Sequence, residues 1–281
     1  MQAYSDFAEV YDELMDNVPY ESWCENIAAL IDRYGISRPV GESRPRGEER
    51  SETENLLASE RDLVLDLGCG TGTLTQLLHK KGYDMIGVDN SPEMLGIAME
   101  KSAKGGGGIL YLLQDMRELE LYSTVGTVLS VCDSLNYLLE EKELLQVFRL
   151  VNNYLYPGGL FLFDFNTVYK YSQVIGDAVI AENREDCSFI WENYYHEQEE
   201  INEYDLTVFV QEEGEHFRRF VENHLQRGYT PQTMCGLVEQ AGMQVIRLLD
   251  ADTLGEVTDQ SQRVYVLARE QGKPSGNMPV L

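Results

Sequence analysis

The chain has 281 residues and a hydrophobic fraction of 43%, which suffices for one large domain with a core and excludes a globally disordered protein. Its 22 basic and 48 acidic residues give a formal net charge of −26. Affinity for nucleic acids and anionic lipid surfaces depends on basic residues, so this charge makes nucleic acid an unfavourable partner and predicts no membrane association. We expect a small-molecule substrate that is neutral or cationic; the composition does not determine the oligomeric state.

The sequence shows no targeting segment, because no basic residue precedes Arg33, and no apolar run is long enough to span a bilayer. Five scattered cysteines without a CxxC pair indicate a reduced, cytoplasmic protein. His, Cys and Asp residues do not cluster with metal-ligand spacing, so we expect no metal.

The first sixty residues divide into two predicted helices and a polar segment. Apolar residues at helical spacing predict a short helix around residues 4–11 and a second helix over 20–35. Residues 37–62 are charged and contain two prolines but no aromatic residue, which indicates a flexible surface insertion. We therefore expect two regions here: N-terminal helices within residues 1–36 and a flexible insertion over residues 37–62.

From residue 63 onward, strand and helix patterns alternate, which is typical of an α/β fold with a parallel sheet covered by helices on both faces. Strands are expected at 63–67, 85–88, 109–114, 125–132, 160–165, 243–249 and 263–268. Residues 63–166 and 226–270 therefore form the expected core, and 271–281 form a frayed tail.

Residues 167–225 interrupt this alternation. Residues 182–222 hold thirteen acidic residues and three arginines, together with many aromatic and aliphatic ones. From Tyr204 to Val210, apolar and polar residues alternate with the period of a half-buried strand. The pattern predicts an antiparallel β insertion after the fifth strand, with one acidic, solvent-facing side, which we interpret as a lid over the substrate.

The sharpest local signal is the segment from Asp66 to Gly72, which directly follows one strand and precedes a helix. Gly68, Gly70 and Gly72 let the backbone turn tightly and approach a ligand, and the helix N-terminus offers free N–H groups. A dinucleotide fingerprint requires a glycine where Thr73 stands, so a nucleotide-dependent oxidoreductase is less favoured. The acid ahead of the glycines suits a cationic amino-acid head group. A purely structural turn is the alternative interpretation.

Polar residues follow three further strands, and the carboxyl ends of neighbouring parallel strands converge on one ligand site. Asp89 ends the second strand, where its carboxylate can accept both hydroxyls of a ribose; helix capping is the alternative. Asp115 ends the third strand, where it can accept from an adenine amino group while the Met116 N–H meets a ring nitrogen; a turn is the alternative. Asp133 begins a run of hydrogen-bonding residues after the fourth strand.

These residues resemble the motifs of class I S-adenosylmethionine-dependent methyltransferases. The matching segments are motif I at 66–72, the ribose acid Asp89, the adenine motif at 114–116, the segment after strand four at 133–137 and the turn before strand five at 155–159. The resemblance covers nearly the whole chain except 37–62, and the aromatic residues near the N-terminus resemble the bacterial YqeM-like group. It implies a Rossmann-like fold with a seven-stranded, mostly parallel sheet in the order 3-2-1-4-5-7-6, strand seven antiparallel, and S-adenosyl-L-methionine as cofactor.

The resemblance and the strand ends together define the candidate site. The expected cofactor-binding residues are Tyr4, Tyr11, Trp23, Asp66, Gly68, Cys69, Gly70, Gly72, Asp89, Asn90, Met94, Gln114, Asp115, Met116, Asp133 and Asn136. The candidate catalytic residues on the acceptor side are Tyr137, Asn166 and His224. His224 is the candidate base, with a surface-strand histidine as the alternative. The N-terminal aromatic residues can stabilise a sulfonium, and a packing stripe is their alternative.

The sequence therefore predicts an enzyme that moves a methyl group from S-adenosylmethionine to a nitrogen or oxygen of a small molecule by in-line SN2 transfer. The cofactor is already an activated electrophile, so the protein must chiefly align the incoming lone pair with the S–CH₃ bond. An RNA-modifying methyltransferase and a non-catalytic cofactor-binding protein are the alternatives, and the net charge disfavours the former.

Overall fold

The structure, a computed structural model, describes residues 8–40, 57, 59–212 and 214–273, and within them the chain forms two β-sheets. The strands of the larger sheet are β1 (Leu63–Leu67), β2 (Asp84–Asp89), β3 (Leu110–Leu113), β4 (Val125–Ser130), β5 (Leu155–Asn166), β10 (Met243–Asp250) and β11 (Arg263–Glu270). Their order is β3-β2-β1-β4-β5-β11-β10, and β11 is antiparallel to both neighbours. The predicted strand order and the antiparallel seventh strand are therefore confirmed.

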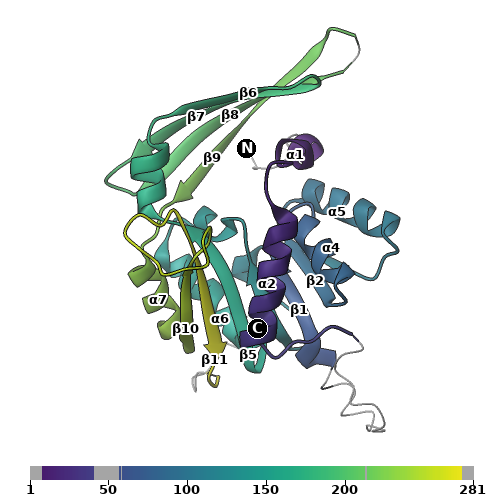
Figure 1. The fold of residues 1–281 in the computed structure, drawn as a ribbon, viewed down its shortest axis with the longest axis vertical. Helices are drawn as coiled ribbons and strands as arrows, with labels where there is room; N and C mark the ends of the chain where they lie inside the picture. Colours follow the sequence, from purple (N-terminus) through teal and green to yellow (C-terminus); the bar gives the residue numbers. More distant parts are fainter. Residues whose placement is uncertain (1–7, 41–56, 58, 213, 274–281) are drawn as a thin grey trace.

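Helices cover both faces of this sheet (Figure 1). The helices are α2 (Tyr20–Tyr34), α4 (Thr73–Lys80) and α5 (Pro92–Lys104), then α6 (Glu141–Tyr154) and α7 (Pro231–Gln240). The apolar faces of α2 and α4 are buried in one cluster with Val64 of β1, whereas those of α6 and α7 share a second cluster with Leu65. The two clusters lie on opposite faces because successive residues of a strand point to opposite sides of the sheet.

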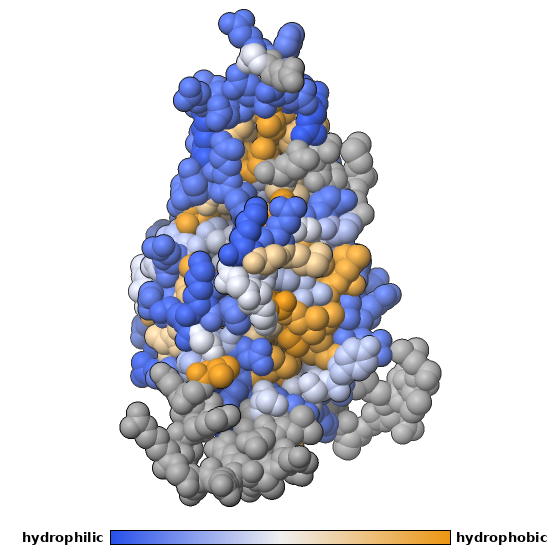
Figure 2. All heavy atoms as spheres, turned by 90° about the vertical axis from the view of Figure 1, so that its right-hand side faces the viewer, coloured by the Kyte–Doolittle hydropathy of each residue, from blue (hydrophilic) through white to orange (hydrophobic). Residues whose placement is uncertain are grey.

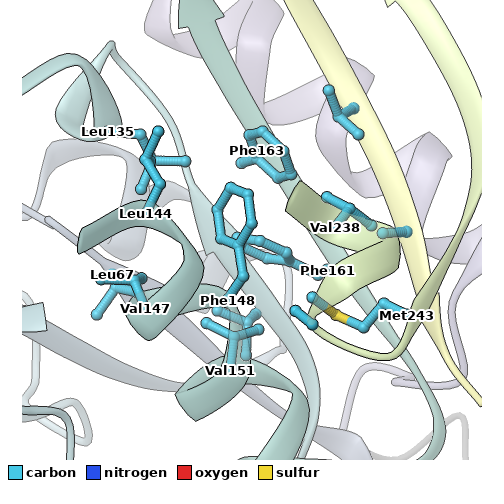
Figure 3. Packing of buried hydrophobic residues seen from close by; sticks show 14 of the residues in the cluster. Leu67, Leu135, Leu144, Val147, Phe148, Val151, Phe161, Phe163, Val238 and Met243 are labelled. Carbon is cyan, nitrogen blue, oxygen red and sulfur yellow. The ribbon is translucent and has the colours of Figure 1, made fainter. Parts of the chain in front are cut away.

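Three phenylalanines form the centre of the core beneath α6 (Figure 3). The Phe148 ring of α6 lies 5.5 Å from the Phe161 ring and 5.1 Å from the Phe163 ring of β5, measured between centroids. Phe165 belongs to the same cluster. The residue between the last two phenylalanines, Asp164, therefore points to the opposite face, toward α2.

The helices α5 and α7 each begin at a residue whose side chain caps the helix. The Ser91 hydroxyl accepts a hydrogen bond from the Met94 N–H at 3.1 Å, with a proline at the first position of α5. Thr230 accepts from the Thr233 N–H at 3.1 Å in the same way and begins α7. The cap at Ser91 ends β2 sharply and places Asp89 at the carboxyl edge of the sheet.

Several strand boundaries differ from the predicted ones. β3 ends at Leu113 and β4 ends at Ser130, so the polar residues expected at their tips lie in the loops that follow. β5 begins at Leu155, because that residue already pairs with Val125 before the register shifts. Gly158 lies in this irregular stretch and has a φ angle of +77°. A residue with a side chain would rarely adopt that angle.

The second sheet is antiparallel and lies above the upper ends of the strands of the larger sheet in Figure 1. Its strands are β6 (Val179–Asn183), β7 (Cys187–His196), β8 (Ile201–Gln211) and β9 (Phe217–Arg227), in that spatial order. We call it the small sheet; it confirms the predicted antiparallel insertion after β5. Because β9 runs to Arg227, the insertion ends two residues later than the predicted boundary at 225. Figure 2 shows mostly hydrophilic residues on the visible surface of this part of the molecule.

The helix α1 (Ala8–Leu14) contacts both the small sheet and the rest of the protein through its side chains. Val10 and Leu14 are buried in a cluster formed with residues of the small sheet. Asp12 accepts a hydrogen bond from the Thr71 hydroxyl at 2.6 Å and one from the Lys101 ammonium at 2.7 Å. Therefore α1 is held between the small sheet and the glycine loop that precedes α4.

The ends of the predicted 37–62 insertion are not exposed as expected. Ser37 is fully buried, and its hydroxyl lies 2.8 Å from that of Thr127 on β4; Asp62 is also buried. Residues 41–56 and 58 of this insertion, Tyr4, and residues 274–281 of the predicted tail lie outside the described residues. Lys273, inside the predicted tail, donates hydrogen bonds to the backbone carbonyls of Asn152 and Leu155. In the described part of the chain, no helix has the length and apolar character needed to span a membrane.

Candidate functional site

A cavity of about 190 Å³ lies at the carboxyl ends of β1, β2 and β4, where ligands of open α/β sheets bind. The glycine loop after β1, the segments after β2, β3 and β4, and the two N-terminal helices form its walls. The predicted residues that line it are Tyr11, Trp23, Asp66, Gly68, Cys69, Gly70, Asp89, Asn90, Met94, Gln114, Met116 and Tyr137. Residues that are distant in the sequence therefore lie together at one cavity, as predicted from the carboxyl ends of neighbouring parallel strands.

The glycine loop has the backbone geometry that its sequence indicates. Gly68, Gly70 and Gly72 have φ angles of +83°, +53° and +72°, a region that residues with a side chain rarely adopt. Apart from its two chain neighbours, no residue in the described part of the chain has an atom within 4 Å of the position that a Cβ of Gly70 would occupy, so these residues leave the backbone there open to a ligand. A Cβ on Gly72, in contrast, would lie 2.6 Å from the Tyr111 hydroxyl, so this glycine permits close packing.

Asp89 joins the loop to the start of α5. Its Oδ2 accepts a hydrogen bond from the Gly70 N–H at 2.8 Å, and its Oδ1 accepts one from the Ser91 N–H at 2.9 Å. Burial raises the pKa of the Asp89 carboxyl, and these backbone donors oppose that rise. Backbone N–H groups of Gly70, Ser91 and Asn90 act on this carboxylate, which has about four lone-pair sites, so Asp89 can also accept from a ligand in the cavity.

Asp66 is buried at the end of β1 and borders the same cavity. Burial raises the pKa of its carboxyl to about 6, and a 2.5 Å hydrogen bond from the Thr75 hydroxyl opposes the rise. The folded protein therefore binds this proton more tightly than the unfolded chain does.

We expect Asp66→Asn to raise the free energy of unfolding at neutral pH. Stability of the wild type should fall as the pH rises from about 4, the ordinary carboxyl pKa, to about 6, because the unfolded chain releases the proton first. The asparagine still accepts from Thr75 but has no proton to release. Denaturant unfolding of both proteins across this range measures the difference between them; a difference that does not grow with pH would contradict the raised pKa.

An ion pair beneath the cavity holds the turn after β4. Cys132, which lines the cavity, and Asp133 adopt left-handed conformations with φ at 69° and 53°. The Asp164 carboxylate accepts from both backbone N–H groups, at 3.1 and 2.9 Å, and lies 3.6 Å from Nη1 of Arg263. The Arg263 guanidinium lies 4.0 Å from the centroid of the Trp23 ring. This pair therefore positions two parts of the cavity wall.

Of the predicted site residues that the structure describes, six do not line the cavity: Gly72, Asp115, Asp133, Asn136, Asn166 and His224. Asp115 turns away to Arg117, whose Nη2 lies 2.6 Å from its Oδ2, and this contact lowers the pKa of the Asp115 carboxyl. The Asp133 carboxylate accepts from the Gln226 amide of β9 at 2.5 Å. Asp115 is thus engaged by a neighbour two residues away, and Asp133 by a residue of a distant strand.

Asn136 and Asn166 lie at the predicted edge of the sheet but join protein segments instead. The buried Asn136 amide donates to the backbone carbonyls of Asn166 and Arg227, at 2.9 and 2.7 Å. The Asn166 amide donates to the Tyr171 hydroxyl at 2.9 Å and accepts from Lys170 at 2.9 Å. Asn136 therefore joins the end of β5 to β9, and the Asn166 side chain is engaged by residues that follow it in the chain.

Tyr137 and His224 come together although 87 residues separate them. Tyr137 belongs to the short helix η2 (Ser134–Tyr137), and its hydroxyl lies 3.0 Å from Nδ1 of His224 on β9. The same hydroxyl lies 3.1 Å from that of Tyr204 on β8. His224 is thus buried beside the cavity wall, not on an exposed strand face.

Several lining residues were not selected from the sequence. They are Tyr20, Leu67, Thr71, Thr73, Leu74, Val88, Val131, Cys132 and Ser134. Most lie inside or next to the motifs, so proximity to a motif was the available signal; Tyr20 shares the helical face of Trp23, with ring centroids 5.5 Å apart. Within the described residues, no group of His, Cys, Asp or Glu is arranged to hold a metal ion.

Comparison with known proteins agrees with this geometry. Residues 64–159 match the family described as "Methyltransferase domain". The chain is 32% identical to the methyltransferase-family protein YqeM of Bacillus subtilis (strain 168), over 95% of this chain and 97% of that protein. The crystal structure of an S-adenosylmethionine-dependent methyltransferase from Clostridium acetobutylicum ATCC 824 superposes with a TM-score of 0.79 and 27% identity, covering 96% of this chain and 100% of that one.

The fold and the cavity define this protein as a class I S-adenosylmethionine-dependent methyltransferase, with S-adenosylmethionine as its cofactor. An S-adenosylmethionine-bound amino pentose methyltransferase from Micromonospora echinaspora shares the fold, with a TM-score of 0.66 and 16% identity over 96% of this chain and 99% of that one. By its sequence, the chain belongs to the YqeM family of methyltransferases.

Proposed function

We propose that this methyltransferase acts on a nitrogen or oxygen of a small molecule, with the small sheet as a lid. The observation that carries the proposal is the 3.1 Å contact between the hydroxyls of Tyr137, on the cavity wall, and Tyr204, on the small sheet. This contact supports a lid, because it joins the small sheet to a residue of the cavity wall. An acceptor that enters beside Tyr137 meets this sheet and α1, which suits a small molecule better than a folded nucleic acid.

We assign the nucleoside part of the cofactor to the walls formed by β2 and β3. Asp89 would accept from the ribose hydroxyls, and Gln114 and Met116 would border the adenine. The open space beside Gly70 supports this assignment, because a Cβ there would fill the space that the loop leaves for the cofactor.

The other end of the cofactor would face aromatic side chains. Tyr11, Tyr20 and Trp23 line the cavity, and aromatic rings attract cations by about 0.5–2 kcal/mol. When bound, S-adenosylmethionine supplies an activated methyl group. The task of this chain is then to hold the acceptor's lone pair in line with the methyl group and to exclude water.

The proposal is tested by following a radiolabelled methyl group. Purified protein is incubated with labelled S-adenosylmethionine and, separately, with a small-metabolite fraction and an RNA fraction of a bacterial extract. We expect label in the small-metabolite fraction, because a protein with net charge −26 repels the RNA backbone. Label in RNA alone, or cofactor binding without transfer to either fraction, contradicts the proposal. Calorimetric titration with S-adenosylmethionine and NAD confirms which cofactor binds.

A further inference from the structure

The helix α1 is packed on the small sheet as part of one unit. Val10 and Leu14 of the helix are buried in an apolar cluster with Cys187, Leu206 and Val208 of the sheet. Burial of these side chains against one another stabilises the contact, because it removes apolar surface from water. We call α1 together with the small sheet the two-part lid.

Polar contacts near the end of α1 strengthen this unit. The Arg184 guanidinium, between β6 and β7, lies 2.9 Å from Oδ1 of Asp16 and also donates to the backbone carbonyl of Glu13. The Cys187 Sγ of β7 lies 3.3 Å from a carboxylate oxygen of Glu13. The helix is therefore joined to the small sheet both by apolar burial and by an ion pair, so the two should move together.

The Asp12 side chain of α1 joins this unit to the glycine loop. Residues two apart in a helix point in nearly opposite directions, so Asp12 faces away from the apolar cluster that contains its neighbours. Its carboxylate accepts from the Thr71 and Thr73 hydroxyls at 2.6 and 3.2 Å. Its Oδ2 lies 2.7 Å from Nζ of Lys101, and that ammonium also donates to the Thr73 hydroxyl at 2.8 Å.

The partners of Asp12 belong to the walls of the cavity or to the helices behind them. Thr71 and Thr73 line the cavity at the start of α4, and Lys101 lies on α5. Tyr11, the neighbour of Asp12 on α1, lines the cavity as well. The contacts of Asp12 must therefore break before α1 can move away from the glycine loop and take Tyr11 with it.

We propose that Asp12 is the latch of the two-part lid and that its contact with Lys101 limits how fast S-adenosylmethionine enters and leaves. The inference rests on the proposed function, because it takes the small sheet as a lid. While the latch is closed, α1 keeps Tyr11 on the cavity wall. When the latch opens, α1 and the small sheet move away together and the cofactor can exchange. Asp12 and Lys101 are positioning residues, since they act through the lid.

The exposure of this contact suits a latch that opens and closes. The side chains of Asp12 and Lys101 are 40% and 26% exposed, so water and salt weaken the attraction between their charges. Three donors nonetheless converge on one carboxylate, and hydrogen bonds to a charged group are stronger than neutral ones. The contact can therefore close the lid without preventing its opening, and it should weaken as the salt concentration rises.

The first test removes the carboxylate. Protein loaded with radiolabelled S-adenosylmethionine is mixed with excess unlabelled cofactor, and the loss of bound label gives the dissociation rate constant. In Asp12→Ala we expect this rate constant to rise about fivefold or more at low salt, because three charge-assisted hydrogen bonds to the lid are lost. The association rate constant should not fall, and the difference from the wild type should shrink as NaCl screens the wild-type pair. An unchanged dissociation rate constant, or weaker binding caused only by slower association, overturns the latch.

Charge reversal separates a latch from a general change of the cavity wall. Lys101→Glu should speed dissociation, because two carboxylates then face each other. The double variant Asp12→Lys with Lys101→Glu should return the rate to within about twofold of the wild type, because the pair is restored in the opposite sense and threonine hydroxyls can also accept from a lysine. If the double variant releases the cofactor as fast as Lys101→Glu, charge pairing does not hold the lid and the latch is rejected.

Lys104→Glu is the matched control for Lys101→Glu. Lys104 lies on the same helix, its side chain is 80% exposed, and it pairs with Glu100 at 3.9 Å. The same change of charge there should leave cofactor exchange as in the wild type, with circular dichroism to confirm that every variant is folded. An equal acceleration in this control would mean that the net charge of α5, and not the latch, governs exchange.

These measurements use no methyl acceptor, so they are independent of the transfer assay above. If the latch variants behave as expected but no small molecule takes up label, the proposed acceptor class fails and the latch stands. If a small molecule takes up label but cofactor exchange is the same in Asp12→Ala and the wild type, the latch fails and the proposed acceptor class stands.

Discussion

We expect Asp89→Ala to weaken the binding of S-adenosylmethionine by about tenfold or more, which corresponds to about 1.4 kcal/mol. The variant loses the carboxylate that we assign to the ribose hydroxyls. It also loses the acceptor for the N–H groups of Gly70 and Ser91, which lie 2.8 and 2.9 Å from the carboxylate oxygens. Both the contact with the cofactor and the shape of the loop that surrounds it therefore depend on one side chain.

Isothermal titration calorimetry measures this loss, with circular dichroism to confirm that the variant is folded. Asp84→Ala is the matched control, because Asp84 is an exposed acid at the opposite end of the same strand. We expect Asp89→Asn to bind with intermediate affinity, since one carbonyl oxygen still accepts. Unchanged binding by a folded Asp89→Ala protein refutes the ribose role.

Asp164→Ala should lower the free energy of unfolding by about 3–5 kcal/mol, the cost of breaking a buried ion pair by removing one partner. Asp164 is fully buried and Arg263 is 8% exposed, so the guanidinium would remain away from water beside an empty site. The variant also loses the acceptor for the N–H groups of Cys132 and Asp133, whose left-handed backbone is itself unfavourable.

Urea unfolding at neutral pH measures this effect. Asp164→Asn should lose less, because an amide oxygen still accepts from the turn although the charge is gone. Glu25→Ala removes a carboxylate from an exposed pair with Lys81 and should change stability little, which controls for loss of an acid as such. An Asp164→Ala protein as stable as the Glu25→Ala protein would show that the turn and Arg263 do not depend on this pair.

Burial favours the protonated form and raises the pKa of the Asp164 carboxyl, while Arg263 opposes that rise. Desolvation of the two buried charges therefore offsets part of their mutual attraction. A gain in stability does not by itself explain why an ion pair occurs here. Its position explains more: it lies under the turn that carries Cys132 and against the Trp23 ring, and both residues line the cavity.

The sequence by itself determined those parts of the protein that depend on neighbours along the chain. The glycine loop follows from three residues that permit positive φ, and the start of α5 follows from Ser91 and its proline. Alternation of strand and helix determined the layers, and the carboxyl ends of parallel strands determined where a ligand binds. The resemblance to known methyltransferases supplied the strand order, which local periodicity does not contain.

The tertiary structure alone decided how the polar side chains at that edge are used. Asn136 and Asp133 have the expected location, but their side chains bond to Arg227 and Gln226 of β9, about ninety residues away. The turn at Cys132 depends on a carboxylate 32 residues away, and the partner of Tyr137 is 87 residues away on the small sheet. Hydrogen bonds between segments so far apart depend on how strands pair and how the two sheets pack, and the period of a single strand carries no information about either.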